Sequence, residues 1–170
     1  MPIYGFYADA YIRAQMIFPA DMINDMSGGN ITNLTWYMQS TSASAWGINV
    51  VVSIAEVDEA SFTSNSFSTA ELTEVWSGTV NGLTSTWEIE LEDPFTYNGG
   101  NLLIDVHSTN EGNYSECSWT GISQTGGSVS TYSYNTPVGT GNSASIRNFL
   151  PKTTFGYAPG GAFCRKPGSL

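Results

Sequence analysis

The chain has 170 residues, 41% of them hydrophobic and 13% aromatic, which is enough for one domain to bury a sizeable core without metals or disulfides. Fifteen acidic residues against five basic ones give a formal net charge of −10. This charge repels phosphate backbones and anionic lipids, so it disfavours nucleic acids and membrane surfaces as partners. Only 12% of the residues are charged, so neutral hydrogen-bonding groups dominate the surface.

The composition also bears on the compartment. Little Lys, abundant Ser, Thr and Asn, and 18 glycines are typical of secreted or cell-surface β domains. Residues 1–4 lack the basic and apolar regions of a signal peptide, so we expect either a cytosolic protein or a fragment of a longer secreted precursor. Cys117 and Cys164 either pair or remain separate thiols, and the sequence leaves both readings open.

Alternation of apolar and polar residues predicts β-strands along most of the chain. The first run, at 31–38, places Leu34, Trp36 and Met38 on one face. The second, at 48–54, is β-branched almost throughout and predicts a central strand.

A polar stretch follows at residues 60–70, with Ser and Thr at many positions. It predicts a long connection of the Greek-key type, with a short helical turn near residues 69–73. The next predicted strand covers residues 75–80.

Residues 86–106 read TWEIELEDPFTYNGGNLLIDV and predict two strands around a Gly-rich turn. Trp87, Ile89 and Leu91 alternate with three glutamates at positions 88, 90 and 92. One face of this segment is therefore apolar and the other acidic, and we expect a hairpin that supports ligand-contacting loops elsewhere.

Further strands are predicted at residues 119–122, 129–134 and 149–157, separated by Gly- and Ser-rich loops. The total is eight or nine strands with no long helix and no internal repeat, at the spacing of a sandwich or barrel. The sequence therefore predicts an all-β fold, a two-sheet antiparallel β-sandwich of jelly-roll type. We expect one module at residues 1–160 and a linker at 161–170.

Several motifs resemble, in order, an accessory β-sandwich domain of large secreted Bacteroidetes proteins that often adjoins fibronectin type III domains. The motifs are GNITNLTWY at 29–37, SF at 61–62, VWSG at 75–78, WEIEL at 87–91 and PFTYNGGNL at 94–102. The resemblance runs from about residue 11 to residue 157. Residues 163–170, FCRKPGSL, resemble the start of a following fibronectin-like module.

This resemblance implies a secreted or cell-surface location, an adhesive or carbohydrate-associated role, and neighbouring domains in the same chain. No catalytic motif accompanies the family. Residues 147–151, RNFLP, depart from the compact Arg-Pro-Asn pattern of the last strand in relatives, which leaves the role of Arg147 open.

Two arrangements could carry catalysis. Asp105 and His107 share one strand face, but a catalytic triad also needs a serine, and no motif marks one. The three glutamates at 88, 90 and 92 lie within the range of glycosidase carboxylates, yet a row of similar carboxylates on a solvated strand is better explained as a charged face that prevents aggregation. We therefore expect no enzyme activity, with a hydrolase as the least favoured alternative.

No cofactor is expected, and zinc is disfavoured because the chain has one His and two distant Cys. A structural Ca²⁺ remains open, since calcium binds six to eight oxygens from loops. The oxygen donors available are Asp9, Asp21, Asp25, Asp58, Glu59 and Asp105.

Glycan binding requires an aromatic ring for the apolar face of a sugar and polar side chains for its hydroxyls. Trp36, Trp76 and Trp87 fall on positions that suit the core. The other two tryptophans, a pair of tyrosines and two polar residues form the predicted ligand-binding set, which is Trp46, Trp119, Tyr132, Tyr134, Asn135 and Arg147. Packing of the two tyrosines between the sheets is the alternative.

The sequence thus predicts a non-catalytic extracellular module that binds a polysaccharide or host glycan and holds a larger secreted bacterial protein against it. The alternative is a structural spacer or a protein-binding adhesin domain without glycan affinity. Two or more exposed aromatic rings in one plane or cleft would favour glycan binding, whereas scattered single rings would favour the spacer.

Overall fold

The structure is a computed structural model. It describes residues 1–3, 9–41 and 46–160. This part of the chain forms ten strands, a four-residue helix α1 (Ala20–Ile23) and a short 3-10 helix η1 (Asn24–Met26). The strands are β1 (Tyr11–Phe18), β2 (Asn30–Thr41), β3 (Ile48–Val57), β4 (Thr73–Val80), β5 (Thr86–Thr96), β6 (Asn101–Ser108), β7 (Cys117–Trp119), β8 (Gly121–Ser133), β9 (Ser145–Pro151) and β10 (Thr153–Ala158).

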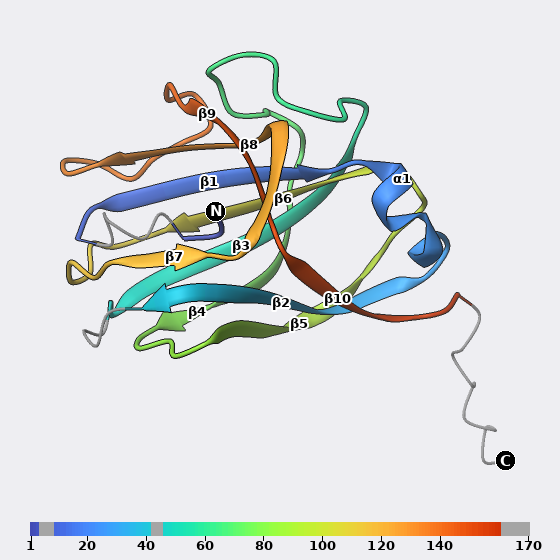
Figure 1. Ribbon diagram of the computed structural model, residues 1–170, viewed down its shortest axis with the longest axis horizontal. Coiled ribbons are helices and arrows are strands. Elements are labelled where there is room, and N and C mark those ends of the chain that lie inside the picture. The colour runs from blue at the N-terminus through green and yellow to red at the C-terminus, as the bar shows by residue number, and fades with distance from the viewer. Residues whose placement is uncertain (4–8, 42–45, 161–170) are drawn as a thin grey trace, which may run out of the picture.

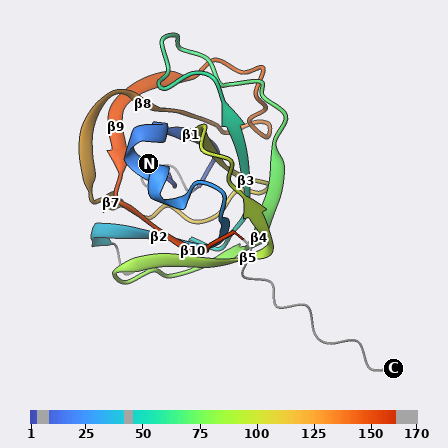
Figure 2. The same ribbon diagram turned by 90° about the vertical axis from the view of Figure 1, so that its right-hand side faces the viewer.

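The strands form two antiparallel sheets that pack face to face (Figures 1 and 2). The larger sheet has the order β4-β3-β6-β1-β8-β9, and the smaller has the order β10-β2-β5, with β7 also paired to β2. The chain passes from one sheet to the other at every connection except β3–β4 and β8–β9. The predicted two-sheet antiparallel sandwich of jelly-roll type is confirmed.

Strand β1 lies at the centre of the larger sheet, between β6 and β8, and the sequence analysis did not predict it. Ile12, Ala14 and Met16 face the inside of the sandwich. Arg13 and Gln15 point to the opposite face, yet only 7% and 0% of their surface is exposed. The apolar-polar alternation of β1 therefore marks two buried faces, one of which is polar.

The predicted hairpin at residues 86–106 is wrong, although both of its strands exist. Strand β5 pairs with β2 in the smaller sheet, whereas β6 pairs with β1 and β3 in the larger sheet. The Gly-rich turn between them carries the chain across the sandwich. The two faces of β5 are as predicted, because Trp87, Ile89 and Leu91 are buried and the intervening glutamates are exposed.

A single carboxylate holds this crossing turn in place. Glu56, near the end of β3, accepts hydrogen bonds from the backbone N–H of Asn98 at 3.0 Å, from its side-chain amide at 2.8 Å, and from the N–H of Gly100 at 2.9 Å. Gly99 lies between them with φ of 107°, in the left-handed region that favours glycine. The turn is therefore organised by a residue more than 40 positions away in the chain.

The core between the two sheets is built around three tryptophans. Trp36 on β2 and Trp87 on β5 stack with ring centroids 4.7 Å apart, and Trp76 on β4 meets Trp87 edge-on at 5.9 Å. Trp36 and Trp87 are buried and Trp76 is half-buried, as predicted. Trp76 comes from the larger sheet, so these contacts join the two sheets.

A second apolar cluster covers the outer face of the larger sheet. Two segments form this cover, residues 58–72 after β3 and residues 134–144 after β8. Phe62 and Phe67 from the first and Val138 from the second pack there with sheet residues such as Ile17. The two segments leave opposite ends of the sheet and meet over its outer face, where Ser66 and Ser143 form a β-bridge. In Figure 1 both lie along the upper side of the view.

Two details predicted for the first of these segments are wrong. Strands β3 and β4 are neighbours in one sheet, so residues 58–72 form a long hairpin loop and no Greek-key crossing. No helical turn occurs near residues 69–73, because residues 69–72 have no regular secondary structure and β4 begins at Thr73. Ser68, just before this stretch, forms its backbone hydrogen bonds with the Gln15 side chain of β1.

Part of the prediction falls on residues that the structure does not describe. The predicted linker at 161–170 and the start of a following module lie outside the described residues, as does Cys164. Cys117 lies buried in β7 with a free thiol. Within the described ranges, no helix is long and apolar enough to cross a membrane.

Candidate ligand-binding site

Two tyrosines meet at the end of β8 and form the most exposed aromatic pair of the described surface. Tyr132 is 38% exposed and Tyr134 is 51% exposed. Their ring centroids lie 5.4 Å apart and the rings are nearly perpendicular, at 77°. The pair therefore presents an aromatic corner, in which the face of one ring adjoins the edge of the other, and no flat platform.

The turn that follows β8 places a polar side chain beside this corner. The hydroxyl of Ser133 accepts hydrogen bonds from the backbone N–H groups of Asn135 and Thr136, both at 3.3 Å. A serine that caps its own turn in this way fixes the direction of the chain after the strand. The side chain of Asn135 is exposed next to Tyr134 in the sequence.

Arg147 lies on the neighbouring strand β9 and points to the same face as Tyr132. It pairs with Ser128 on β8, and its Nε donates a hydrogen bond to the Ser130 hydroxyl at 3.1 Å. Ser128, Ser130 and Tyr132 share one strand face because side chains alternate along β8. Three of the predicted residues, Tyr132, Tyr134 and Asn135, thus lie together at the end of β8. Arg147 lies opposite Ser128, four residues before Tyr132, and its side chain extends along the strand as far as Ser130.

The other two predicted residues belong to the core, and their prediction as exposed stacking rings is wrong. Trp46 is 3% exposed, and its indole N–H donates to the carbonyl of Ser115 at 2.9 Å. Trp119 is 4% exposed and donates in the same way to the carbonyl of Ile3 at 2.9 Å. Polar residues precede both tryptophans in the sequence, but each indole N–H donates to a backbone carbonyl of a distant segment, so each ring can be buried.

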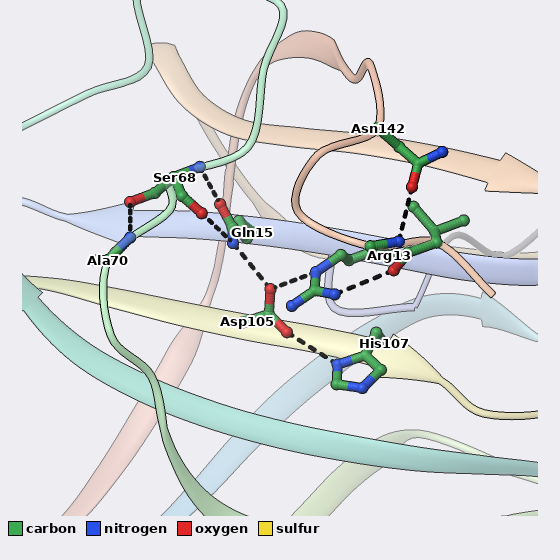
Figure 3. A network of polar contacts seen from close by, with 9 residues as sticks. Arg13, Gln15, Ser68, Ala70, Asp105, His107 and Asn142 are labelled. Atoms are coloured by element: carbon green, nitrogen blue, oxygen red, sulfur yellow. Dashed lines mark hydrogen bonds and ion pairs between the residues drawn. The ribbon is translucent and has the colours of Figure 1, made fainter.

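A polar cluster lies on the outer face of the larger sheet (Figure 3). It was not predicted from the sequence. Asp105 on β6 accepts hydrogen bonds from Arg13 Nε at 2.8 Å and from Gln15 Nε2 at 2.9 Å, both on β1. Its second carboxylate oxygen lies 3.0 Å from Nδ1 of His107. The carboxylate is fully buried, so these partners replace the water that it lost on folding.

The same cluster anchors the two covering segments. Arg13 Nη1 donates to the carbonyl of Val138 at 3.0 Å, and its guanidinium lies 5.9 Å from the ring of Phe67. Gln15 donates to the carbonyl of Ser68 at 3.2 Å and accepts from the Ser68 N–H at 2.7 Å. Arg13 and Gln15 thus fix one segment each to the sheet. The sequence feature that could have predicted this cluster is the spacing of two between Arg13 and Gln15, which places both side chains on one face of a strand.

The Asp105–His107 pair matches the predicted shared face, but its surroundings differ from those of a catalytic dyad. In a triad the carboxylate orients the histidine and a serine lies within hydrogen-bond reach. Here Asp105 is also bound by Arg13 and Gln15, and no serine hydroxyl is bonded to His107 among the described contacts. The arrangement is suited to holding the covering segments in place.

The acidic side chains do not converge on one another to form a metal site in the described residues. Within the described parts of the chain, no three His, Cys, Asp or Glu side chains lie close enough together to hold a metal ion. Of the oxygen donors considered for calcium, Asp105 is occupied by Arg13, Gln15 and His107. The six candidates are thus not gathered in one place.

The fold places the chain in the class of antiparallel two-sheet β-sandwiches, with an exposed aromatic corner at the end of one strand of the larger sheet. No family model, no curated protein and no solved structure matches the chain in the three comparisons with known proteins.

Proposed function

We propose that the chain is a non-catalytic carbohydrate-binding or adhesion module of a larger secreted or cell-surface bacterial protein. The observation that carries this proposal is the aromatic corner of Tyr132 and Tyr134, with Asn135 in the adjoining turn and the Arg147 side chain reaching Ser130 on the same strand face as Tyr132. The resemblance to accessory domains of secreted Bacteroidetes proteins supports the location and the adhesive role.

The corner suits the chemistry of a sugar. The apolar C–H face of a pyranose packs on one tyrosine ring, and the edge of the second ring bounds it on one side. The two phenol hydroxyls, the Asn135 amide and the Arg147 guanidinium supply donors and acceptors for sugar hydroxyls. Because the site is shallow, affinity for a single sugar is weak, and repeated units of a polysaccharide raise it by avidity.

A structural spacer or protein-binding module without glycan affinity is the second candidate. The finding that favours it is the burial of Trp46 and Trp119, which removes two of the four predicted stacking rings. The perpendicular geometry of the two remaining rings also gives less stacking area than a flat platform.

Affinity electrophoresis through gels that contain mannan, xylan, laminarin or mucin, with and without Ca²⁺, tests the proposal. The intact chain should be retarded by at least one polymer, and the Tyr132→Ala/Tyr134→Ala double variant should lose about tenfold or more of that affinity. Tyr114→Ala and Tyr157→Ala are matched controls, because these tyrosines are also 51% and 44% exposed.

Two results would overturn the proposal in favour of the spacer. One is the absence of retardation by every polymer for the intact, folded chain. The other is an equal loss of retardation in the control variants, which would mean that exposed tyrosines adhere to the gel without a site.

A further inference from the structure

The loop at residues 58–72 is longer than its position in the fold requires. It joins β3 and β4, which are neighbours in the sheet, with Ile54 paired to Thr73. Two residues suffice to join adjacent antiparallel strands. A compact loop of this length whose ends lie side by side is an Ω-loop, and such ordered loops frequently carry a function.

This Ω-loop is fixed to the sheet and to its neighbours at several points. Ser68 exchanges two hydrogen bonds with Gln15, at 2.7 and 3.2 Å. The N–H of Phe62 donates to the carbonyl of Gly126 on β8 at 2.8 Å. Asn65 accepts from the N–H of Ala144 through its carbonyl at 3.1 Å and from the N–H of Ile146 through its side chain at 3.0 Å. The loop is therefore preorganised.

The loop lines a cavity of about 420 Å³ that opens to solvent on the outer face of the larger sheet. Ile17, Phe62 and Phe67 contribute apolar side chains, all three of them buried. Six Ser and Thr residues between positions 61 and 69 and the carboxylate of Glu59 supply the polar lining. Among the residues that the structure describes, no basic side chain lines the cavity.

We propose that this cavity binds one neutral polyhydroxylated unit, such as a single pyranose sugar. The hydroxyls of Ser and Thr both donate and accept, as sugar hydroxyls do, and the apolar floor accommodates C–H groups. The carboxylate of Glu59 accepts from two hydroxyls at once and disfavours anionic ligands. The volume lies within the range of small-molecule sites.

The cavity is separate from the aromatic corner, so this proposal goes beyond the proposed function and does not depend on it. Tyr132 pairs with Ile12 near the start of β1, whereas Ile17 in the cavity lies near the end of that strand, about 17 Å away by strand geometry. Ile12 belongs to the inner core and Ile17 to the outer one, so the two sites occupy opposite faces of the sheet.

The test is a titration of the whole chain, labelled with ¹⁵N, with glucose, galactose, mannose or N-acetylglucosamine, followed by amide chemical shifts. At least one sugar should cause saturable shifts at residues 59–70, with a Kd of about 1 to 10 mM, as expected for a small open site. Glucuronate, the charged counterpart of glucose, should bind more weakly, and Glu59→Gln should reduce that difference.

Matched variants then assign the site. Ser64→Ala/Ser66→Ala removes two cavity hydroxyls that lie 2.6 Å apart and should weaken binding at least about fivefold. Ser40→Ala/Ser118→Ala removes an equivalent pair, 2.7 Å apart and on β2 and β7, and should leave the Kd unchanged.

Three outcomes overturn the cavity proposal: no shifts with any of the four sugars, shifts that avoid residues 59–70, or equal losses in both serine pairs. A result that rules out the aromatic corner as the polysaccharide site is distinguishable from a result that rules out the cavity. In that case the Tyr132→Ala/Tyr134→Ala variant keeps its polysaccharide retardation, while the sugar titration at residues 59–70 proceeds as expected.

Discussion

Arg13 and Asp105 form a buried ion pair across two central strands, with 2.8 Å between Nε and Oδ2 and side chains that are 9% and 0% exposed. The two residues lie 92 positions apart in the chain. Because Arg13 also binds the Val138 carbonyl, this ion pair links the sheet to a segment that covers it.

Asp105→Asn should strongly destabilise the protein. It keeps the size of the side chain but leaves the buried Arg13 guanidinium without its counter-charge, which costs about 3 to 5 kcal/mol. Urea unfolding followed by tryptophan fluorescence measures the change. Glu90→Gln, on the exposed face of β5, is the control and should stay within about 0.5 kcal/mol of the parent. A cost for Asp105→Asn that matches the control would contradict the structural role of the pair.

Stability should fall in acid partly because of Glu56. Burial alone would raise the pKa of this carboxyl, but hydrogen bonds from Gly100, Asn98 and Gly99 outweigh it and hold the pKa below its ordinary value of 4.5. A lowered pKa in the folded state means that the charged carboxylate stabilises the fold above pH 4.5. This stabilisation is lost as the pH falls through the folded-state pKa.

Glu56→Gln tests this pH dependence. Above pH 4.5 the variant should be less stable than the parent by about 1 to 2 kcal/mol, and the difference should shrink as the pH falls toward 3. Urea unfolding at several pH values measures it. A difference that stays constant over this range would mean that charge on Glu56 plays no part.

Gly99→Ala should destabilise the crossing turn between β5 and β6. The residue has φ of 107°, and an added Cβ would lie 2.6 Å from the Ser27 hydroxyl. The expected cost is about 1 to 3 kcal/mol, measured by thermal unfolding. Gly82→Ala is the control, since a Cβ there meets no atom within 4 Å and the residue has no positive φ. Equal effects of the two variants would speak against strain at Gly99.

Trp46→Ala should act through stability and not through ligand contact. Removing this buried indole leaves a cavity and costs about 3 to 5 kcal/mol. The milder Trp46→Phe variant should remain folded and keep the polysaccharide retardation of the parent. Selective loss of retardation in folded Trp46→Phe would instead place Trp46 in the ligand site.

Cys117 should be unreactive in the native protein. Burial raises the pKa of its thiol to about 12, against a small opposing effect of the hydrogen bond with Trp119. Only the thiolate reacts with iodoacetamide, so alkylation at pH 8 should be at least about a hundredfold slower in the folded than in the urea-unfolded chain. Cys164→Ser removes the other thiol and makes the measurement specific. Similar rates in both states would show that Cys117 is accessible.

The sequence by itself determined the fold class and much of the core. Alternation in β2, β3 and β5 depends only on which residues avoid water, so it predicted the buried faces of Trp36 and Trp87 correctly. The exposed glutamates of β5 and the shared face of Asp105 and His107 follow from the same period of two.

Only the tertiary structure decided which strands pair and which polar residues are buried. The turn at residues 97–100 looks like a hairpin turn, yet its shape is set by Glu56 from a distant strand. Arg13 is buried because the Asp105 carboxylate and the Val138 carbonyl, both far away in the chain, accept its hydrogen bonds. Trp46 and Trp119 are buried because backbone carbonyls far along the chain accept their indole N–H groups. The local alternation of residues shows which side chains avoid water. Which strands pair, and which buried polar groups find hydrogen-bond partners, depends on contacts between residues far apart in the chain.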